Sequence, residues 1–411
     1  MEQGQALPVV LPLYFERYAE YKTALLHEEN YNRNVGIIVT LPTFNETHCD
    51  LAVQSIIKNN YPGCEVAVIV LVNQSTNASR NSIEKNKETV NKLQNLKPPS
   101  WVTIHLLNVF LPEKKSGVGL ARKIVMDEAA RWFSALENKG TIICFDADCY
   151  CNPSFLNKIK KHFELGAEAG ISFYEHPLTN NGIILYETYL RYYIDGLRFA
   201  GFPYAHQTLG SCIAVRADIY MKFGGMNTRK AGEDFYFLNK IIPFCNFQEF
   251  NDVTIYPAPR KSNRVPFGTG QSILKIETQK DWRFYHPRIF HELKVLFDQI
   301  KRRSLDLTTL PDAVNNFIDS YPFMEMIERV DRISKTKIQF EKNFFNAFDA
   351  FKVLKFTHFC RDKYHASVSS YQAVCELDSC LWKMNLKELD QIERLHKIRN
   401  WDRNFIKDHK C

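Results

Sequence analysis

Short apolar runs alternate with helical patterns in the first half of the chain. The run at residues 142–145 is continuous, as is typical of a strand buried on both faces of a parallel sheet, and the mainly apolar runs at 35–41, 65–72 and 101–107 are predicted to be further strands. Residues 50–58 show helical apolar spacing, 79–96 form a more polar helical stretch, and 117–130 are a glycine turn leading into a helix. This order predicts a three-layer α/β/α domain with a mainly parallel sheet.

The pattern changes beyond residue 287. Long helical periodicity appears at residues 291–300, 313–333, 338–360 and 386–398, with few glycines and no strand-like runs. Residues 8–30 resemble a short amphipathic helix that leads into the first strand. We therefore predict an N-terminal helical segment at 1–32, an α/β domain at 33–286 and a helical C-terminal region at 287–411.

Polar turns follow the predicted strands at one edge of the sheet. They begin at Thr43, Asn73 and Asp146, and the carboxyl edge of an open α/β sheet is where ligands bind. Asp146 and Asp148 are two residues apart, so in an extended chain both side chains would face one ligand. Two carboxylates suit Mg²⁺ or Mn²⁺ bridging a diphosphate, although Asp-x-Asp alone is equally typical of an ordinary acidic turn.

A fourth element, the glycine turn Gly117-Val-Gly119, enters a helix at the same edge. Glycines allow close backbone approach, and a helix N-terminus attracts phosphate. Arg122, one turn into the helix, would add a charge-assisted bond to a diphosphate; the alternative is a solvent-facing arginine. The segment lacks the third glycine of a dinucleotide fingerprint.

These motifs, in this order, resemble GT-A-fold glycosyltransferases of family 2 type. The resemblance rests on Pro42–Glu46, Asn73–Thr76, Gly119–Arg122 and Phe145–Asp148, and it continues through residues 210–216, 223–226 and 232–234. It covers about residues 35–240 and implies a Rossmann-like nucleotide-sugar-binding domain with hexosyltransferase-like activity. The family usually carries an aspartate where this chain has Asn73, which leaves the choice of nucleotide open.

The resemblance also implies roles for individual residues. The nucleoside would be held by four residues, Thr43, Asn45, Glu46 and Asn73. The diphosphate would be held by Gly119 and Arg122. Asp146 would contact the ribose or the metal, and Asp148 the Mn²⁺ or Mg²⁺ bound to a nucleoside-diphosphate sugar, the donor. His286 would be a third metal ligand, although a lone histidine before a proline is equally a structural residue.

Two further acids, Glu233 and Asp234, precede an apolar helix. A carboxylate there is often a helix cap. The resemblance implies instead that Asp234 is the general base of an inverting transfer to a hydroxyl of a carbohydrate or glycoconjugate, with Glu233 orienting the acceptor or the loop. A retaining transferase of the same fold and a catalytically silent nucleotide-sugar-binding or interaction protein are the alternatives. A nucleotidyltransferase is disfavoured, because the first loop lacks a glycine- and lysine-rich signature.

The aromatic residues between 171 and 206 leave two interpretations open. The resemblance places this stretch towards the acceptor, where aromatic faces would stack on sugars. For Tyr189 and Phe199 an ordinary place in the core is at least as well supported.

Composition and short sequence patterns limit the binding partners and the cellular compartment that we expect for this protein. A net charge of +7 suits anionic ligands, and since the only basic cluster is the short Lys301–Arg303, we expect no nucleic acid. The sequence has no run of about 18 apolar residues, so we expect no membrane span and leave a peripheral membrane contact open. The N-terminus lacks a signal-peptide pattern, the eleven cysteines lack zinc spacing, and a glycan at the sequons beginning at Asn45, Asn73 and Asn77 would block the ligand edge. We therefore expect a cytoplasmic protein.

Overall fold

The computed structural model describes residues 11–113, 116–261, 268–279 and 282–408. The chain forms two compact units. Unit 1 comprises residues 1–177, 208–259 and 263–267, and unit 2 comprises residues 178–207, 260–262 and 268–411. Each unit is described by itself.

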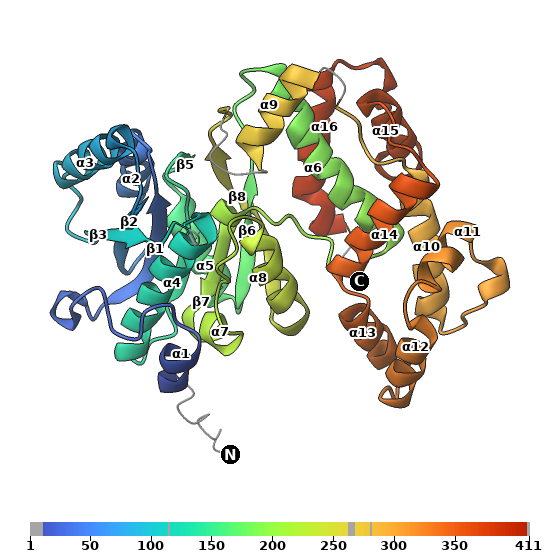
Figure 1. Cartoon of the computed structure of the whole chain (residues 1–411), viewed down its shortest axis with the longest axis horizontal. Coiled ribbons are helices and arrows are strands. Elements are labelled where there is room, and N and C mark those ends of the chain that lie inside the picture. Colours follow the sequence, from blue (N-terminus) through green and yellow to red (C-terminus); the bar gives the residue numbers. More distant parts are fainter. Residues whose placement is uncertain (1–10, 114–115, 262–267, 280–281, 409–411) are drawn as a thin grey trace. The chain divides into compact units, whose positions relative to one another are not determined.

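Unit 1 is built on a sheet with the strand order β3-β2-β1-β4-β7-β6-β8-β5 (Figure 1). The strands are β1 (Val35–Thr43), β2 (Glu65–Ser75), β3 (Val102–Leu111), β4 (Thr141–Cys144), β5 (Cys149–Cys151), β6 (Ala169–Tyr174), β7 (Ile213–Arg216) and β8 (Phe247–Pro257). Strands β1 to β4 are parallel, whereas β7 runs antiparallel to both β4 and β6. The predicted α/β fold is confirmed, including the four parallel strands in their expected order.

Most helices of unit 1 pack against strands of this sheet. The helices of this unit are α1 (Leu11–Arg17), α2 (Cys49–Ile57), α3 (Arg80–Gln94), α4 (Val118–Ala135), α5 (Phe155–Glu164), α7 (Ala217–Lys222) and α8 (Glu233–Ile241), with short turns η1 (Glu28–Asn30), η2 (Gly210–Cys212) and η3 (Ile242–Phe244). Helix α4 is buried around most of its surface. It carries four buried charged residues, each of which has an ionic partner: Arg122, Lys123, Asp127 and Glu128.

The described part of unit 2 is helical, as the C-terminal periodicity predicts. Its helices are α6 (Asn181–Ala200), α9 (Thr269–Gln279), α10 (Arg288–Arg302), α11 (Asp312–Ile318), α12 (Phe323–Arg332), α13 (Lys337–Ala347), α14 (Ala350–Lys363), α15 (Ser370–Leu377) and α16 (Gln391–Asp408), with short turns η4 (Leu307–Thr309), η5 (Asp378–Trp382) and η6 (Leu386–Glu388). The helix expected at 313–333 is interrupted before Pro322, which cannot continue one. The helix expected at 338–360 is interrupted at Asp349, whose side chain caps α14. No helix of the described ranges is both long and apolar enough to cross a bilayer.

Helices α6 and α9 belong to unit 2, although they lie within the stretch predicted as the α/β domain. In α6, Tyr192 packs against Phe284 and Phe290 at ring distances of 5.3 and 5.5 Å. Tyr189 likewise packs against Phe284 at 5.3 Å, and Phe199 lies 4.7 Å from the His291 ring. These contacts favour the core interpretation of the aromatic stretch. The predicted division at residues 32 and 286 stays a prediction.

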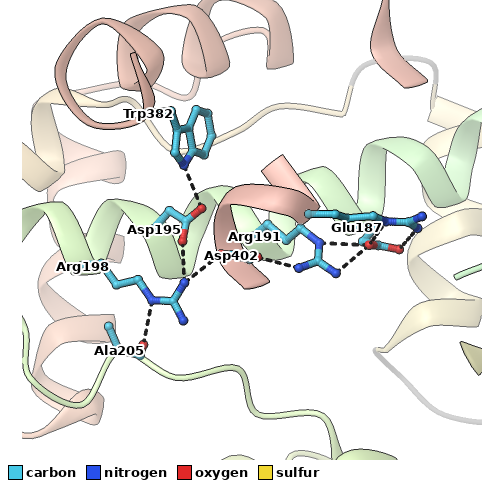
Figure 2. A network of polar contacts seen from close by, with 8 residues as sticks. Glu187, Arg191, Asp195, Arg198, Ala205, Trp382 and Asp402 are labelled. Carbon is cyan, nitrogen blue, oxygen red and sulfur yellow. Dashed lines mark hydrogen bonds and ion pairs between the residues drawn. The ribbon is translucent and has the colours of Figure 1, made fainter. Parts of the chain in front are cut away.

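A buried network of charges fastens α16 to α6 (Figure 2). Arg191 donates to Glu187 at 2.9 Å and to Asp402 at 2.5 Å. Arg198 donates to Asp195 at 2.9 Å and to Asp402 at 2.8 Å. Asp402 therefore joins the two arginines of α6 to the last helix.

Arg399 and Trp382 complete this buried network. Arg399 donates two bonds of 2.7 Å to Glu187, and the Trp382 indole donates to Asp195 at 2.9 Å. Burial raises the pKa of Asp195 well above its ordinary value, and the neighbouring Asp402 adds to the effect. Ions removed from water are tolerated only when they are paired and hydrogen-bonded, so this network fixes how α16 lies on α6.

We predict that Asp402→Asn destabilises the protein by about 3–5 kcal/mol, because two buried guanidinium groups lose a shared carboxylate. Urea unfolding followed by circular dichroism measures this loss. The matched control is Asp298→Asn, which breaks the half-exposed Lys294–Asp298 pair and should cost about 0–1 kcal/mol. Equal losses in the two variants would contradict the prediction.

Candidate active site

The carboxyl ends of β1, β2 and β4 meet at one edge of the sheet. In the parallel ladders Thr43 lies opposite Val72, and Thr40 lies opposite Cys144. The structure therefore brings the turns that follow β1, β2 and β4 to the same edge. Three predicted site residues, Thr43, Asn73 and Asp146, come from these turns or the strand ends beside them.

Helix α3 holds the loop that follows β1. The Asn86 side chain accepts a bond from the Asn45 N–H at 3.0 Å and donates to the Asn73 carbonyl at 3.2 Å. The Thr89 hydroxyl donates to the Glu46 carbonyl at 2.7 Å. Asn45 itself has φ +52°, in the left-handed region that asparagine tolerates better than most residues. Sequence reasoning missed Asn86 and Thr89, since nothing distinguishes them from the solvated residues of a polar helix.

Asp146 and Asp148 lie in a turn between β4 and β5. The Cys149 N–H donates to the Asp146 carbonyl at 3.0 Å, which closes the turn, and the Asp148 carbonyl accepts from Ala258 at 3.2 Å. The expectation that the two acids share an extended strand is wrong, because β4 ends at Cys144. Both side chains are partly exposed. Burial raises the pKa of the Cys49 thiol to about 12, and the charges of Glu46, Asp50 and Asp148 add to this shift.

Arg122 connects the two acidic motifs. Its side chain is 3% exposed and donates to Asp146 at 2.6 Å, and its other terminal nitrogen pairs with the buried Glu233. Burial alone would lower the pKa of Arg122, but Asp146 and then Glu233 raise it, so the guanidinium stays charged. The alternative of a solvent-facing arginine is wrong. A Cβ on Gly210 would lie 2.5 Å from this guanidinium, so residue 210 must be a glycine for Arg122 to take this position.

The glycine turn before α4 has a packing role. A Cβ on Gly119 would overlap the Arg229 carbonyl oxygen and lie 3.1 Å from the Glu233 Cβ. The chain leading into α8 therefore lies directly on the first turn of α4. This contact explains the glycine without a ligand, and the predicted diphosphate contact of Gly119 and Arg122 stays a prediction.

Glu233 and Asp234 begin α8, directly after Gly232, which has φ +74°. Burial raises the pKa of Glu233 to about 7 against the opposing effect of Arg122, with Asp234 adding to the rise. Burial also raises the pKa of Asp234, and Arg122 opposes that shift too. Asp234 accepts a bond of 2.8 Å from the Phe235 N–H, but the N-cap residue of α8 is Gly232. Neither acid is thus the N-cap residue of α8, and the role of Asp234 as a general base stays a prediction.

His286 lies in unit 2, just before α10. Its Nδ1 accepts a bond from the Arg288 N–H at 3.2 Å, which is the structural role weighed above, and burial lowers its pKa. Its role as a third metal ligand stays a prediction. Across the described residues, no group of three histidine, cysteine, aspartate or glutamate side chains is arranged to hold a metal ion.

The donor set at the turn nevertheless fits Mg²⁺ or Mn²⁺. Asp146 and Asp148 supply hard carboxylate oxygens on partly exposed side chains. Mg²⁺ is usually held by one or two carboxylates, with substrate phosphates and water completing its coordination. The residue types at this turn thus fit such an ion, and metal binding by Asp146 and Asp148 stays a prediction.

The chain matches no protein-family model and no curated protein sequence. It is similar in structure to S. aureus TarS (residues 1–349) in complex with UDP-GlcNAc, at 15% identity and a TM-score of 0.39, over 91% of this chain and 92% of that one. It is also similar to glucosyl-3-phosphoglycerate synthase from Mycobacterium tuberculosis in complex with Mg²⁺ and UDP, at 16% identity and a TM-score of 0.33, over 56% of this chain and 72% of that one.

We predict that Arg122→Gln costs about 3–5 kcal/mol of stability at pH 8, because Asp146 and Glu233 lose their shared cation. Glu233 already has a pKa of about 7 with Arg122 present, and removing the cation should raise that pKa further. The loss should therefore grow as the pH rises through about 7 and stay nearly constant below it, where Glu233 is protonated in both folded proteins. Urea unfolding between pH 5 and 8 in a chelator measures it.

The control for this variant is Arg216→Gln. Arg216 pairs with Glu168 and Asp218 in unit 1, but its side chain is 26% exposed. Its loss should be smaller and should change little over this pH range. A pH-independent loss in Arg122→Gln would contradict the assignment of Arg122 as the cation that compensates Glu233.

Proposed function

We propose that this protein is a metal-dependent glycosyltransferase that moves a sugar from a nucleoside-diphosphate sugar to a hydroxyl acceptor with inversion. The observation that supports it best is the buried Arg122 guanidinium, which contacts Asp146 on one side and Glu233 on the other. One side chain thus spans the acids suited to a metal-bound diphosphate and the acids suited to activating an acceptor.

The donor half of the proposal uses the strand-end turns. Asp146 and Asp148 would hold Mn²⁺ or Mg²⁺, which neutralises the leaving nucleoside diphosphate. Thr43, Asn45, Glu46 and Asn73 would hold the nucleoside, since they lie at or beside the same sheet edge and α3 bonds to the backbone of the last three. The Asn73 amide can both donate to and accept from a base edge.

The acceptor half uses the pair at the start of α8. The acceptor oxygen attacks the anomeric carbon, the bond from that carbon to the diphosphate breaks, and Asp234 takes the hydroxyl proton. A base is most effective when its pKa lies near the working pH, and burial shifts the pKa of Asp234 upward. Glu233, held by Arg122, would orient the loop. Unit 2 would support this site or receive a carbohydrate or glycoconjugate acceptor.

The test is a turnover assay with a panel of nucleoside-diphosphate sugars, UDP-sugars first, with and without Mn²⁺. NMR of the product distinguishes inversion from retention at the anomeric carbon. Binding of a nucleoside diphosphate without any turnover would instead support a catalytically silent binder. Fractionation of the cells that make the protein tests the expected cytoplasmic location.

We predict that Asp148→Ala abolishes turnover, because the metal that binds the diphosphate loses a carboxylate ligand. The fold should stay intact, because the Asp148 side chain is partly exposed. In a thermal-shift assay the wild type should gain about 2.7 kcal/mol from nucleoside diphosphate and Mn²⁺ at a hundredfold the dissociation constant. The variant should gain little. Undiminished wild-type activity in a strong chelator would contradict metal dependence.

We predict that Asp234→Asn lowers turnover by at least about 10² while donor binding and melting temperature stay near those of the wild type. Asparagine keeps the shape of the side chain and can still accept the Phe235 N–H bond, but it cannot take a proton. Steady-state kinetics and thermal melts separate the two roles. If turnover stays within a few-fold of wild type, Asp234 serves only the start of the helix.

A further inference from the structure

A buried cluster away from the proposed site joins α1 to α4 and α7 (Figure 1). Asp127 on α4 is 2% exposed and accepts bonds from the hydroxyls of Tyr14 at 2.6 Å and Tyr220 at 2.8 Å. The Lys123 ammonium donates to the same carboxylate at 3.0 Å. Burial raises the pKa of Tyr14, and Asp127 adds to the effect, so the phenol keeps the proton that it donates. One buried acid therefore ties three helices together.

The chain that follows α1 runs along the same helix. Glu128 is 1% exposed and accepts bonds from the backbone N–H groups of Leu25 at 2.8 Å and Leu26 at 3.1 Å. The Tyr31 ring stacks on Trp132 at 4.8 Å. We call residues 14–31 the N-terminal strap. Its contacts with buried charged and aromatic groups of α4 make it part of unit 1.

The strap reaches the turn that precedes the acidic pair. Gly224 and Gly225 have φ of +73° and +65°, the left-handed region that favours glycine. The Tyr14 hydroxyl lies where a Cβ on Gly225 would stand, and the Tyr18 ring lies 3.5 Å from the Cβ position of Gly224. Lys240 donates to the Gly225 carbonyl at 2.8 Å. Tyr14 and Lys240 thus hold the turn.

The segment from this turn to Glu233 is short and internally bonded. The Asn227 side chain accepts from the Arg229 N–H at 3.1 Å and donates to the Glu233 carbonyl at 3.3 Å. The Arg229 carbonyl packs on Gly119 at the start of α4. Only seven residues, 226–232, separate the Gly224–Gly225 turn from Glu233, and the Asn227 side chain bridges part of this segment to the Glu233 carbonyl.

We infer that Tyr14 is a positioning residue for the proposed sugar transfer, which holds the Gly224–Gly225 turn against α4 and so sets the place of Glu233 and Asp234. The inference rests on the proposed function. On this inference the N-terminal strap affects the acceptor side of the proposed site, and the turns that would bind the nucleotide do not depend on it. Small displacements of a reacting group, even from distant changes, can cost up to about 10² in rate.

The experiment compares Tyr14→Phe with Tyr18→Phe in the full chain. Phenylalanine keeps each ring and removes only the hydroxyl, and Tyr18 on the same segment is 55% exposed. We expect kcat of Tyr14→Phe to fall about tenfold or more with the donor Kd within twofold of wild type. Amide hydrogen exchange in residues 226–232 should be faster in Tyr14→Phe and unchanged in Tyr18→Phe.

The outcomes separate this inference from the proposed function. If kcat, measured well below both melting temperatures, is the same for the two variants, Tyr14 has only a structural role and the inference is overturned while the transferase stands. If the wild type turns over no nucleoside-diphosphate sugar, the proposed function fails. Hydrogen exchange then tests the strap, and unchanged exchange in residues 226–232 of Tyr14→Phe overturns the inference as well.

Discussion

The buried guanidinium of Arg122 is the constraint on which the candidate site depends. A charge with 3% of its side chain exposed is tolerated only because carboxylates face it, here Asp146 and Glu233. Those acids come from a turn and a helix far apart in the sequence, so the pairing fixes α8 against the end of β4. A side chain at position 210 would occupy the space of the guanidinium, and a side chain at position 119 would overlap the Arg229 carbonyl in the segment that leads to Glu233.

The two units use buried charge in the same way. In unit 1, α4 directs Arg122 to the acids at the sheet edge and Asp127 to the hydroxyls of α1 and α7. In unit 2, α6 directs Arg191 and Arg198 to Asp402 on the last helix. Such pairs add less to stability than apolar packing of the same volume would, but a wrong arrangement leaves a charge without a partner. Their effect here is to select one arrangement of the helices.

The sequence predicts the parallel part of the sheet well because its signal is local. Strands β1, β2 and β4 are continuous apolar runs, and the polar turns that follow them mark the ligand edge. The site details depend on partners remote in sequence. The hydrogen bonds of Asn86 to both Asn45 and Asn73, and the contact of Arg122 with Glu233, have no signature in either segment alone. The apolar run at 142–145 predicts an extended chain into Asp146 and Asp148, since hydrophobic periodicity does not show that β4 ends at Cys144.

The division of the chain groups α6 with the C-terminal helices. Residues 178–207 leave unit 1 after β6, form α6 within unit 2, and return to unit 1 just before Gly210, the residue that packs on Arg122. The segment that forms α6 therefore lies, in the sequence, between two parts of unit 1. Helix α6 buries Arg191 and Asp195, whose partners lie on α16 and η5 near the end of the chain. Arg191 also pairs with Glu187 and Asp195 with Arg198 inside α6, so the last helices add further partners to charges that are already paired within that helix.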